Sequence, residues 1–106
     1  MEEMTYYPII STPELSNGER LFLEIEGEAI VLFNIAGNFF AIGDVCTHDN
    51  GVLGDGDIEG YEVICPRHGA RFDVRDGKAT RLPAVQPTKS YPVRVVDGKV
   101  EIGLDS

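Results

Sequence analysis

Basic residues are scarce in this sequence of 106 residues. Nine lysines and arginines stand against 18 aspartates and glutamates, so the formal net charge is -9. A surface this acidic repels nucleic acid and anionic lipid and favours a basic protein partner, because complementary charge speeds encounter. We therefore expect neither nucleic acid nor a membrane as a partner. Acidity also favours solubility, so the charge alone does not assign a function.

Long hydrophobic runs and a signal peptide are missing as well. The longest apolar-rich stretch, AIVLFNIAGNFFAIG at residues 29–43, is interrupted by Asn34, Gly37 and Asn38 and is too polar to cross a bilayer. The first ten residues, MEEMTYYPII, carry acid where a signal peptide needs base, and they contain no long apolar region. We therefore expect a cytoplasmic protein.

Helical patterns are rare, and β-strand patterns dominate the chain. Residues 21–26 begin as an alternation that places Leu21, Leu23 and Ile25 on one face. Residues 29–35 form a continuous run of apolar and branched side chains. Such a run is typical of a strand that is covered on both sides.

Turn signals separate these strand-like segments. The pairs Asp76-Gly77 and Asp97-Gly98 predict tight hairpin turns, because the second residue of such a turn needs a positive φ. Residues 44–63 lack a clear strand pattern, and a loop that long in a small domain is usually functional. The sequence therefore predicts a single all-β domain, a small antiparallel sandwich or barrel.

The two cysteines and two histidines of the chain fall into two short motifs. Cys46 and His48 stand in CTHDNG, and Cys65 and His68 stand in CPRHG, with residues 49–64 between the histidine of one motif and the cysteine of the next. Each motif follows a strand-like segment. One end of a β scaffold can therefore hold both loops.

Four interpretations of these motifs compete. Chance requires the pairing of cysteine with histidine to be a coincidence in both motifs. A Cys46–Cys65 disulfide is disfavoured in a cytoplasmic protein and leaves the histidines unexplained. Structural zinc suits two thiolates and two imidazoles, although zinc modules usually group two cysteines in one knuckle. A [2Fe–2S] cluster can have two cysteines on one iron and two histidines on the other, and two loops that each supply one cysteine and one histidine fit this arrangement.

Together, CTH and CPRHG resemble the motifs of the Rieske iron–sulfur proteins, and the resemblance extends over roughly Leu21 to Ile102. It implies a single Rieske domain over residues 1–106, an antiparallel β-sandwich or barrel. The cluster-binding loops, at about 44–51 and 63–73, are expected at one tip. The later segment LPAVQP, residues 82–87, is expected to pack over the cluster.

The resemblance also implies the cluster ligands. Cys46 and Cys65 are expected to bind the inner iron of the [2Fe–2S] cluster, and His48 and His68 the outer iron. The histidines of that family lie near the surface and face the electron-transfer partner. No catalytic residue is implied.

Four further positions indicate the branch of the family. The respiratory and photosynthetic members carry an extra cysteine in each loop, joined as a disulfide, where this chain has Gly51 and Arg67. They also carry a serine and a tyrosine whose hydroxyls donate to cluster sulfurs, where this chain has Ala70 and Phe72. Hydrogen bonds to sulfur stabilise the reduced cluster, so their loss lowers the potential. We expect a midpoint near the low end of the Rieske range, about −150 mV.

The pattern is similar to the soluble Rieske ferredoxins that serve ring-hydroxylating oxygenases. This resemblance implies a monomeric electron carrier, not an enzyme, that takes single electrons from a flavin-dependent ferredoxin reductase to a terminal oxygenase or similar acceptor. No histidine remains for the mononuclear iron of a terminal oxygenase. Two alternatives stay open: a small Rieske subunit of a larger oxidoreductase such as a nitrite reductase, and a zinc-stabilised binding module.

Overall fold

The structure is a computed structural model that describes residues 4–47, 51–66 and 69–105. These residues form β1 (Met4–Ser11), the 3-10 helix η1 (Thr12–Glu14), β2 (Arg20–Ile25), β3 (Glu28–Ile35), β4 (Asn38–Gly43), β5 (Ile58–Glu59), β6 (Glu62–Ile64), β7 (Arg71–Asp73), β8 (Ala79–Arg81), β9 (Ser90–Tyr91), β10 (Val93–Val96) and β11 (Lys99–Asp105). This part of the chain contains no helix that is long and apolar enough to cross a membrane.

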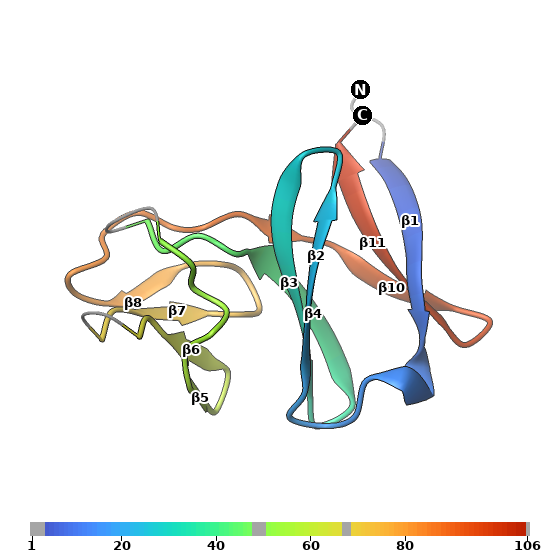
Figure 1. Ribbon diagram of the computed structural model, residues 1–106, viewed down its shortest axis with the longest axis horizontal. Coiled ribbons are helices and arrows are strands. Elements are labelled where there is room, and N and C mark those ends of the chain that lie inside the picture. The colour runs from blue at the N-terminus through green and yellow to red at the C-terminus, as the bar shows by residue number, and fades with distance from the viewer. Residues whose placement is uncertain (1–3, 48–50, 67–68, 106) are drawn as a thin grey trace.

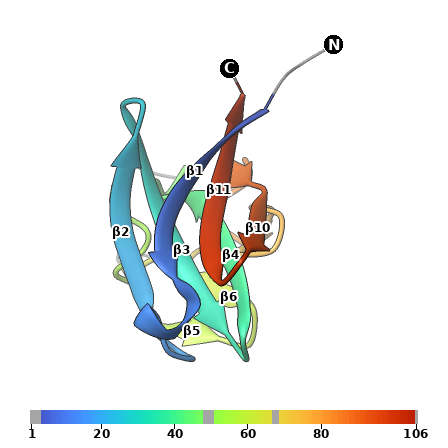
Figure 2. The same cartoon turned by 90° about the vertical axis from the view of Figure 1, so that its right-hand side faces the viewer.

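The strands form three antiparallel sheets, in the orders β1-β11-β10, β2-β3-β4-β9 and β5-β6-β7-β8. Side chains of the first two sheets share one apolar core, so these sheets form a sandwich (Figure 2). The third sheet forms a small lobe beside the sandwich, at the left of the view in Figure 1 and away from the chain termini. This architecture confirms the predicted all-β antiparallel fold.

Strand β3 lies between two apolar cores. Ile30 and Leu32 contribute to the core of the sandwich, whereas Val31 and Phe33 contribute to the core of the small lobe. All four side chains are fully buried. The prediction of a strand covered on both faces is therefore confirmed, and β3 joins the small lobe to the sandwich.

Two other local predictions are confirmed. On β2, Ile25 is buried in the core of the sandwich, and Leu21 and Leu23 pack against that core, as their alternation predicts. The Asp97-Gly98 turn joins β10 to β11 with φ angles of 51° and 75°. Both angles lie in the left-handed region that a tight hairpin turn requires.

The hairpin predicted from Asp76-Gly77 is present, because β7 and β8 pair antiparallel, but its connection is longer than a two-residue turn. Of the two residues only Gly77 has a positive φ, 80°, and the connection runs from the end of β7 at Asp73 to the start of β8 at Ala79. A Cβ atom at Gly77 would lie 2.2 Å from the carbonyl oxygen of Thr88. Close approach of another segment therefore adds to the need for glycine at this position.

The expectation that residues 44–63 lack a clear strand is wrong for β5, which lies within them, whereas β6 coincides with the strand-like segment expected directly before Cys65. Ile58 pairs with Val63 across a turn in which Gly60 has a φ of 62°. Val63 is fully buried, and Ile58 packs against the core of the small lobe. A strand of two residues is too short to show an alternation, so the sequence pattern does not reveal β5.

Candidate functional site

The two cysteines of the sequence motifs meet in the small lobe. Cys46 follows β4, and Cys65 comes directly after β6. Their relative exposures are 0% and 1%, and both side chains belong to the core of the small lobe. Neither forms a disulfide within the described part of the chain. The fold therefore gathers two thiols from distant parts of the sequence in one apolar environment.

Main-chain hydrogen bonds close each cysteine loop at its base. The Cys46 amide donates to the carbonyl oxygen of Gly51 at 2.8 Å, and the Cys65 amide donates to the carbonyl oxygen of Ala70 at 2.6 Å. The Gly69 amide donates back to the carbonyl oxygen of Cys65 at 3.1 Å. Gly69 has a φ of 74°, which glycine adopts without strain. Each loop thus brackets four residues between a cysteine and its hydrogen-bonded partner.

The predicted histidine ligands, His48 and His68, lie outside the described residues, and so do Asp49 and Arg67. By sequence, each histidine falls within one of the two closed loops. Among the described residues no group of three or more His, Cys, Asp or Glu side chains could hold a metal ion. The described donor set is a pair of buried thiols, a type of ligand that suits iron–sulfur clusters, zinc and copper(I). This pair fits the cysteine half of the predicted cluster.

Ala70 and Phe72 stand where the respiratory and photosynthetic members of the family carry a serine and a tyrosine, so these two positions near the cysteines have no side-chain hydroxyl. Ala70 and Phe72 are fully buried, and both belong to the same apolar cluster as Cys46 and Cys65. An apolar shell of this kind limits solvent access and raises the free energy of added charge. It is consistent with the expected low midpoint potential.

The proline-rich segment at residues 82–87 contacts the first loop. The Thr47 hydroxyl donates to the carbonyl oxygen of Gln86 at 2.6 Å, and Ala84 is buried in the core that contains both cysteines. Leu82 and Val85 of the same segment are 71% and 72% exposed. The segment thus packs its small side chain against the site and presents its large apolar side chains to solvent.

Two charged residues that the sequence analysis did not identify stabilise the connection after the first loop. The Asp44 carboxylate accepts hydrogen bonds from the amides of Leu53 and Gly54 at 3.1 and 2.6 Å. The Arg20 guanidinium on β2 donates to the carbonyl oxygens of Gly54 and Gly56. An arginine among apolar residues of a strand, in a chain with nine basic residues, is the sequence signal that could have drawn attention to Arg20.

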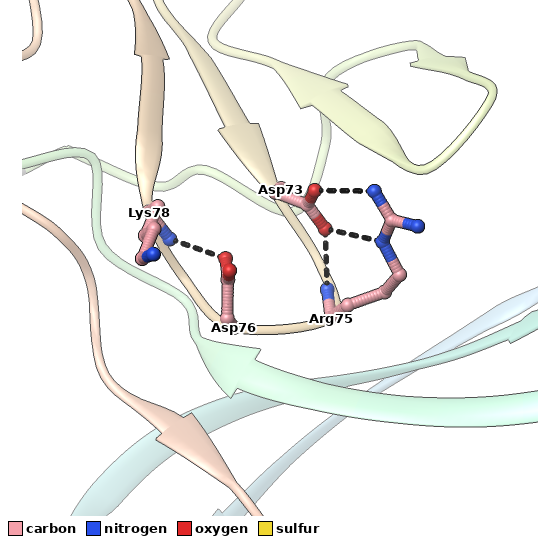
Figure 3. A network of polar contacts seen from close by, with 4 residues as sticks. All are labelled: Asp73, Arg75, Asp76 and Lys78. Carbon is pink, nitrogen blue, oxygen red and sulfur yellow. Dashed lines mark hydrogen bonds and ion pairs between the residues drawn. The ribbon is translucent and has the colours of Figure 1, made fainter.

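The β7–β8 connection of the small lobe is held by its own side chains (Figure 3). Arg75 binds both carboxylate oxygens of Asp73, at 3.0 and 2.8 Å, and its guanidinium lies 4.4 Å from the centre of the Tyr61 ring. Asp76 accepts from the Lys78 amide at 2.9 Å. The hydrogen bonds from Arg75 lower the pKa of Asp73 below its ordinary value. Asp73 is therefore a fixed anion near neutral pH.

A second ion-paired arginine follows the second cysteine loop. Arg71 on β7 donates to Glu59 at 3.0 Å and to Glu62 at 3.2 Å. These hydrogen bonds raise the pKa of Arg71. Arg71, the first residue of β7 after the second loop, is therefore paired with carboxylates from the β5–β6 hairpin.

A pocket of about 320 Å³ opens beside the first loop, with Val45 and Thr47 in its lining. At its other side Tyr91 donates to the carboxylate of Glu28 at 2.6 Å, and Lys89 donates to the same oxygen at 2.9 Å. The hydrogen bond from Tyr91, and then that from Lys89, lowers the pKa of Glu28. Burial, followed by the contact with Glu28, raises the pKa of Tyr91.

Comparison with known proteins gives a consistent picture. Residues 5–92 match the family model described as the Rieske [2Fe-2S] domain. The chain is 36% identical over 95 residues to the ferredoxin component of the naphthalene 1,2-dioxygenase system of Pseudomonas putida, covering 90% of this chain and 91% of that protein. It is 40% identical over 98 residues to the 3-phenylpropionate/cinnamic acid dioxygenase ferredoxin subunit of Shigella flexneri, covering 92% and 89%.

A solved structure supports the same assignment of the fold. The Sphingomonas yanoikuyae B1 ferredoxin superimposes with a TM-score of 0.85 at 33% sequence identity, covering 94% of this chain and 99% of that protein. The similarity therefore extends over both the sandwich and the small lobe.

Proposed function

This chain belongs to the Rieske [2Fe-2S] domain family, and on that premise we propose that it is the electron-carrying ferredoxin of a multicomponent oxygenase system. One observation supports this most strongly: two buried cysteines lie in one apolar core, and each stands at the start of a loop that is closed by a main-chain hydrogen bond. The two relatives described above are ferredoxin components of dioxygenase systems, which supports the role of a carrier.

We assign the four ligands as the sequence motifs indicate. Cys46 and Cys65 bind one iron of the [2Fe–2S] cluster, and His48 and His68 bind the other. When bound, the cluster accepts and releases one electron. The chain contributes the burial of the two thiols and the rigid loop bases that orient them. It also contributes the apolar core that excludes water from them.

The chain acts as a carrier and does not itself transform an organic substrate. A terminal oxygenase needs a mononuclear iron site, commonly two histidines and a carboxylate. Both histidines of this sequence are assigned to the cluster loops, so none remains for such a site. Electrons therefore pass through the chain from a flavin-dependent reductase to a terminal oxygenase or similar acceptor.

The partner is proposed to dock on the end of the small lobe, where the two loops lie. Val52, Leu82 and Val85 are exposed large apolar residues in the segments next to the cysteines. Asp55 and Asp57 are exposed acids in the same lobe. A partner surface with an apolar centre and basic residues around it complements this arrangement, because charge guides encounter and apolar contact favours binding.

The first test is the content of the purified protein. Anaerobically prepared material should be brown, should contain iron and labile sulfide in equal amounts, and should take up one electron per chain on titration with dithionite. Electron paramagnetic resonance of the reduced form should show the low average g value of mixed histidine and cysteine ligation. Colourless protein that contains zinc without iron or sulfide would support the zinc-module alternative and exclude the proposal.

The second test concerns whether the carrier is free or part of a larger enzyme. Size-exclusion chromatography of a lysate should place the brown protein at the size of a single chain. Elution with a large oxidoreductase in high salt would instead support the small-subunit alternative. A free monomer that is reduced by a flavin-dependent reductase in the presence of a reduced nicotinamide cofactor completes the assignment.

A further inference from the structure

A short segment of the chain, Leu53–Asp57, connects the two cysteine loops; we call it the bridge segment. It begins two residues after Gly51, whose carbonyl oxygen closes the first loop. It ends one residue before β5 of the small lobe. The contacts at its two ends involve residues that stand next to the cysteines in the sequence.

At its first end the bridge segment is hydrogen-bonded to Asp44, two residues before Cys46. The Asp44 carboxylate accepts from the amides of Leu53 and Gly54. A Cβ atom at Gly54 would lie 2.9 Å from that carboxylate and 2.7 Å from the Phe22 ring. Because Asp44 stands two residues before Cys46, a shift of the bridge segment displaces the base of the first loop.

At its second end the bridge segment is hydrogen-bonded to Ile64, the residue before Cys65. The Ile64 amide donates to the carbonyl oxygen of Asp57 at 2.9 Å. A Cβ atom at Gly56 would lie 1.6 Å from the carbonyl oxygen of Ile64, so only glycine permits this approach. Ile64 directly precedes Cys65. The path of the bridge segment therefore sets the position of one cysteine loop relative to the other.

Arg20 binds the middle of the bridge segment from outside the small lobe. Its guanidinium donates to the carbonyl oxygens of Gly54 and Gly56, which stand on either side of the exposed Asp55. The same guanidinium lies 5.6 Å from the centre of the Phe33 ring, which is fully buried in the core that contains both cysteines. Hydrogen bonds from a charged donor are stronger than neutral ones, and a cation within about 6 Å of an aromatic ring centre is attracted to the face of the ring.

We propose that Arg20 is a positioning residue for the cluster: by fixing the bridge segment, it fixes the separation and orientation of the two cysteine loops. This inference rests on the proposed function. It differs from a general contribution to stability, because other side chains form the apolar core of the sandwich. Loss of the guanidinium should therefore alter the site before it alters the rest of the fold.

The test compares Arg20→Met with a matched control, Arg94→Met. Arg94 also combines an ion pair with stacking, since it binds Glu101 at 2.7 Å and lies 3.8 Å from the centre of the Tyr6 ring. It lies on β10 of the sandwich, where its partners are Glu101 on β11 and Tyr6 on β1. Both substitutions remove one positive charge and keep a long side chain. A difference between them is therefore specific to the position.

The first readout is the rate at which the purified holoprotein loses its visible absorbance in the presence of an iron chelator. Arg20→Met should lose absorbance about tenfold faster than the unmodified protein, the factor expected for loss of a charged hydrogen bond. Arg94→Met should remain within about twofold, as is usual for a surface substitution. Equal rates for the two variants would overturn the inference.

The second readout separates positioning from stability. At equal cluster content, the reduced Arg20→Met protein should give broader electron paramagnetic resonance lines than Arg94→Met, because the ligand geometry varies from molecule to molecule. If Arg20 acted only on stability, the spectrum of the cluster that remains would be unchanged. Identical line shapes would therefore also reject the proposal.

A milder pair of variants decides the matter if Arg20→Met does not fold. Arg20→Lys keeps the charge but shortens the donor and removes the planar stacking group, and Arg94→Lys is its control. Arg20→Lys should lose the cluster faster than Arg94→Lys, and equal rates would contradict the inference. Failure of the proposed function itself is distinguishable, since in that case the unmodified protein would contain no cluster to lose.

Discussion

The hydroxyl of Thr47 donates a hydrogen bond of 2.6 Å to the backbone carbonyl of Gln86, which lies 39 residues later in the chain. Thr47 immediately follows Cys46, and Gln86 belongs to the proline-rich segment at residues 82–87. The bond thus attaches this segment to the first cysteine loop. Its removal is a direct way to ask whether the segment protects the site.

Thr47→Val should loosen the proline-rich segment with little effect on global stability. The lost hydrogen bond is exposed, so water can replace the donor and the cost should be about 1 kcal/mol or less. That energy corresponds to an increase of about fivefold in the local opening equilibrium. Amide hydrogen exchange in residues 82–87 should rise by this factor. Thr80→Val, at an exposed threonine of β8, should leave it unchanged, and equal exchange in both variants would contradict the prediction.

Replacement of either cysteine should abolish the cluster. In Cys46→Ser or Cys65→Ser a hydroxyl replaces a buried thiolate, and sulfur is the ligand that iron–sulfur clusters prefer. Iron and labile sulfide should both fall to background in the purified variants, together with the visible absorption. Full iron and sulfide content in a folded variant would show that the replaced cysteine is not a ligand.

Phe72→Tyr should raise the midpoint potential from its expected value near −150 mV. Phe72 is fully buried among the residues that surround the cysteines, and a hydroxyl there can donate toward cluster sulfur. A hydrogen bond to a charged group contributes about 1.5 kcal/mol, which corresponds to about 60 mV for one electron. A redox titration measures the shift. The control is Phe39→Tyr, at a partly buried residue that packs against the core of the sandwich, and it should leave the midpoint unchanged.

The main features of the fold follow from local sequence patterns. The run at residues 29–35 predicts a strand covered on both sides, because such a strand can tolerate apolar side chains on both faces. Asp97-Gly98 predicts a tight turn because both residues can adopt a positive φ. Strand β5 was not predicted, since Ile58 pairs with Val63 over too few residues to produce a periodic signal. Its stability comes from packing against the rest of the small lobe.

The site was predicted to the extent that its chemistry depends on rare residue types. Cys46 and Cys65 stand out because the chain has two cysteines, and the structure places both in one core. The roles of Arg20 and Asp44 could not be predicted in the same way. Arg20 acts on carbonyl oxygens 34 and 36 residues away, and backbone carbonyls occur at every position of a sequence. Such contacts depend on the tertiary path of the chain and carry no motif.

The Glu28–Tyr91 hydrogen bond predicts a stability effect that is confined to a window of pH. Tyr91 and Lys89 lower the pKa of Glu28, so the stability contributed by its carboxylate is present above its ordinary pKa and is lost as the pH falls through the lowered value. Burial and Glu28 raise the pKa of Tyr91, so the stability contributed by its phenol is present below its ordinary pKa, about 10, and is lost as the pH rises above it. The contribution is therefore largest between about pH 5 and pH 9.

Tyr91→Phe tests this window because it removes the hydroxyl and keeps the ring. Urea unfolding at pH 7 should show a loss of about 1 kcal/mol relative to the unmodified protein, the typical contribution of one hydrogen bond. The difference should shrink as the pH falls below the ordinary carboxyl pKa and through the lowered pKa of Glu28, and as it rises above about 10, where the phenol of the unfolded chain ionises. The control is Tyr6→Phe on β1 of the sandwich, a tyrosine whose ring lies against Arg94. A loss for Tyr91→Phe that stays constant from acid to alkaline pH would mean that ring packing, and not the bond to Glu28, accounts for the effect.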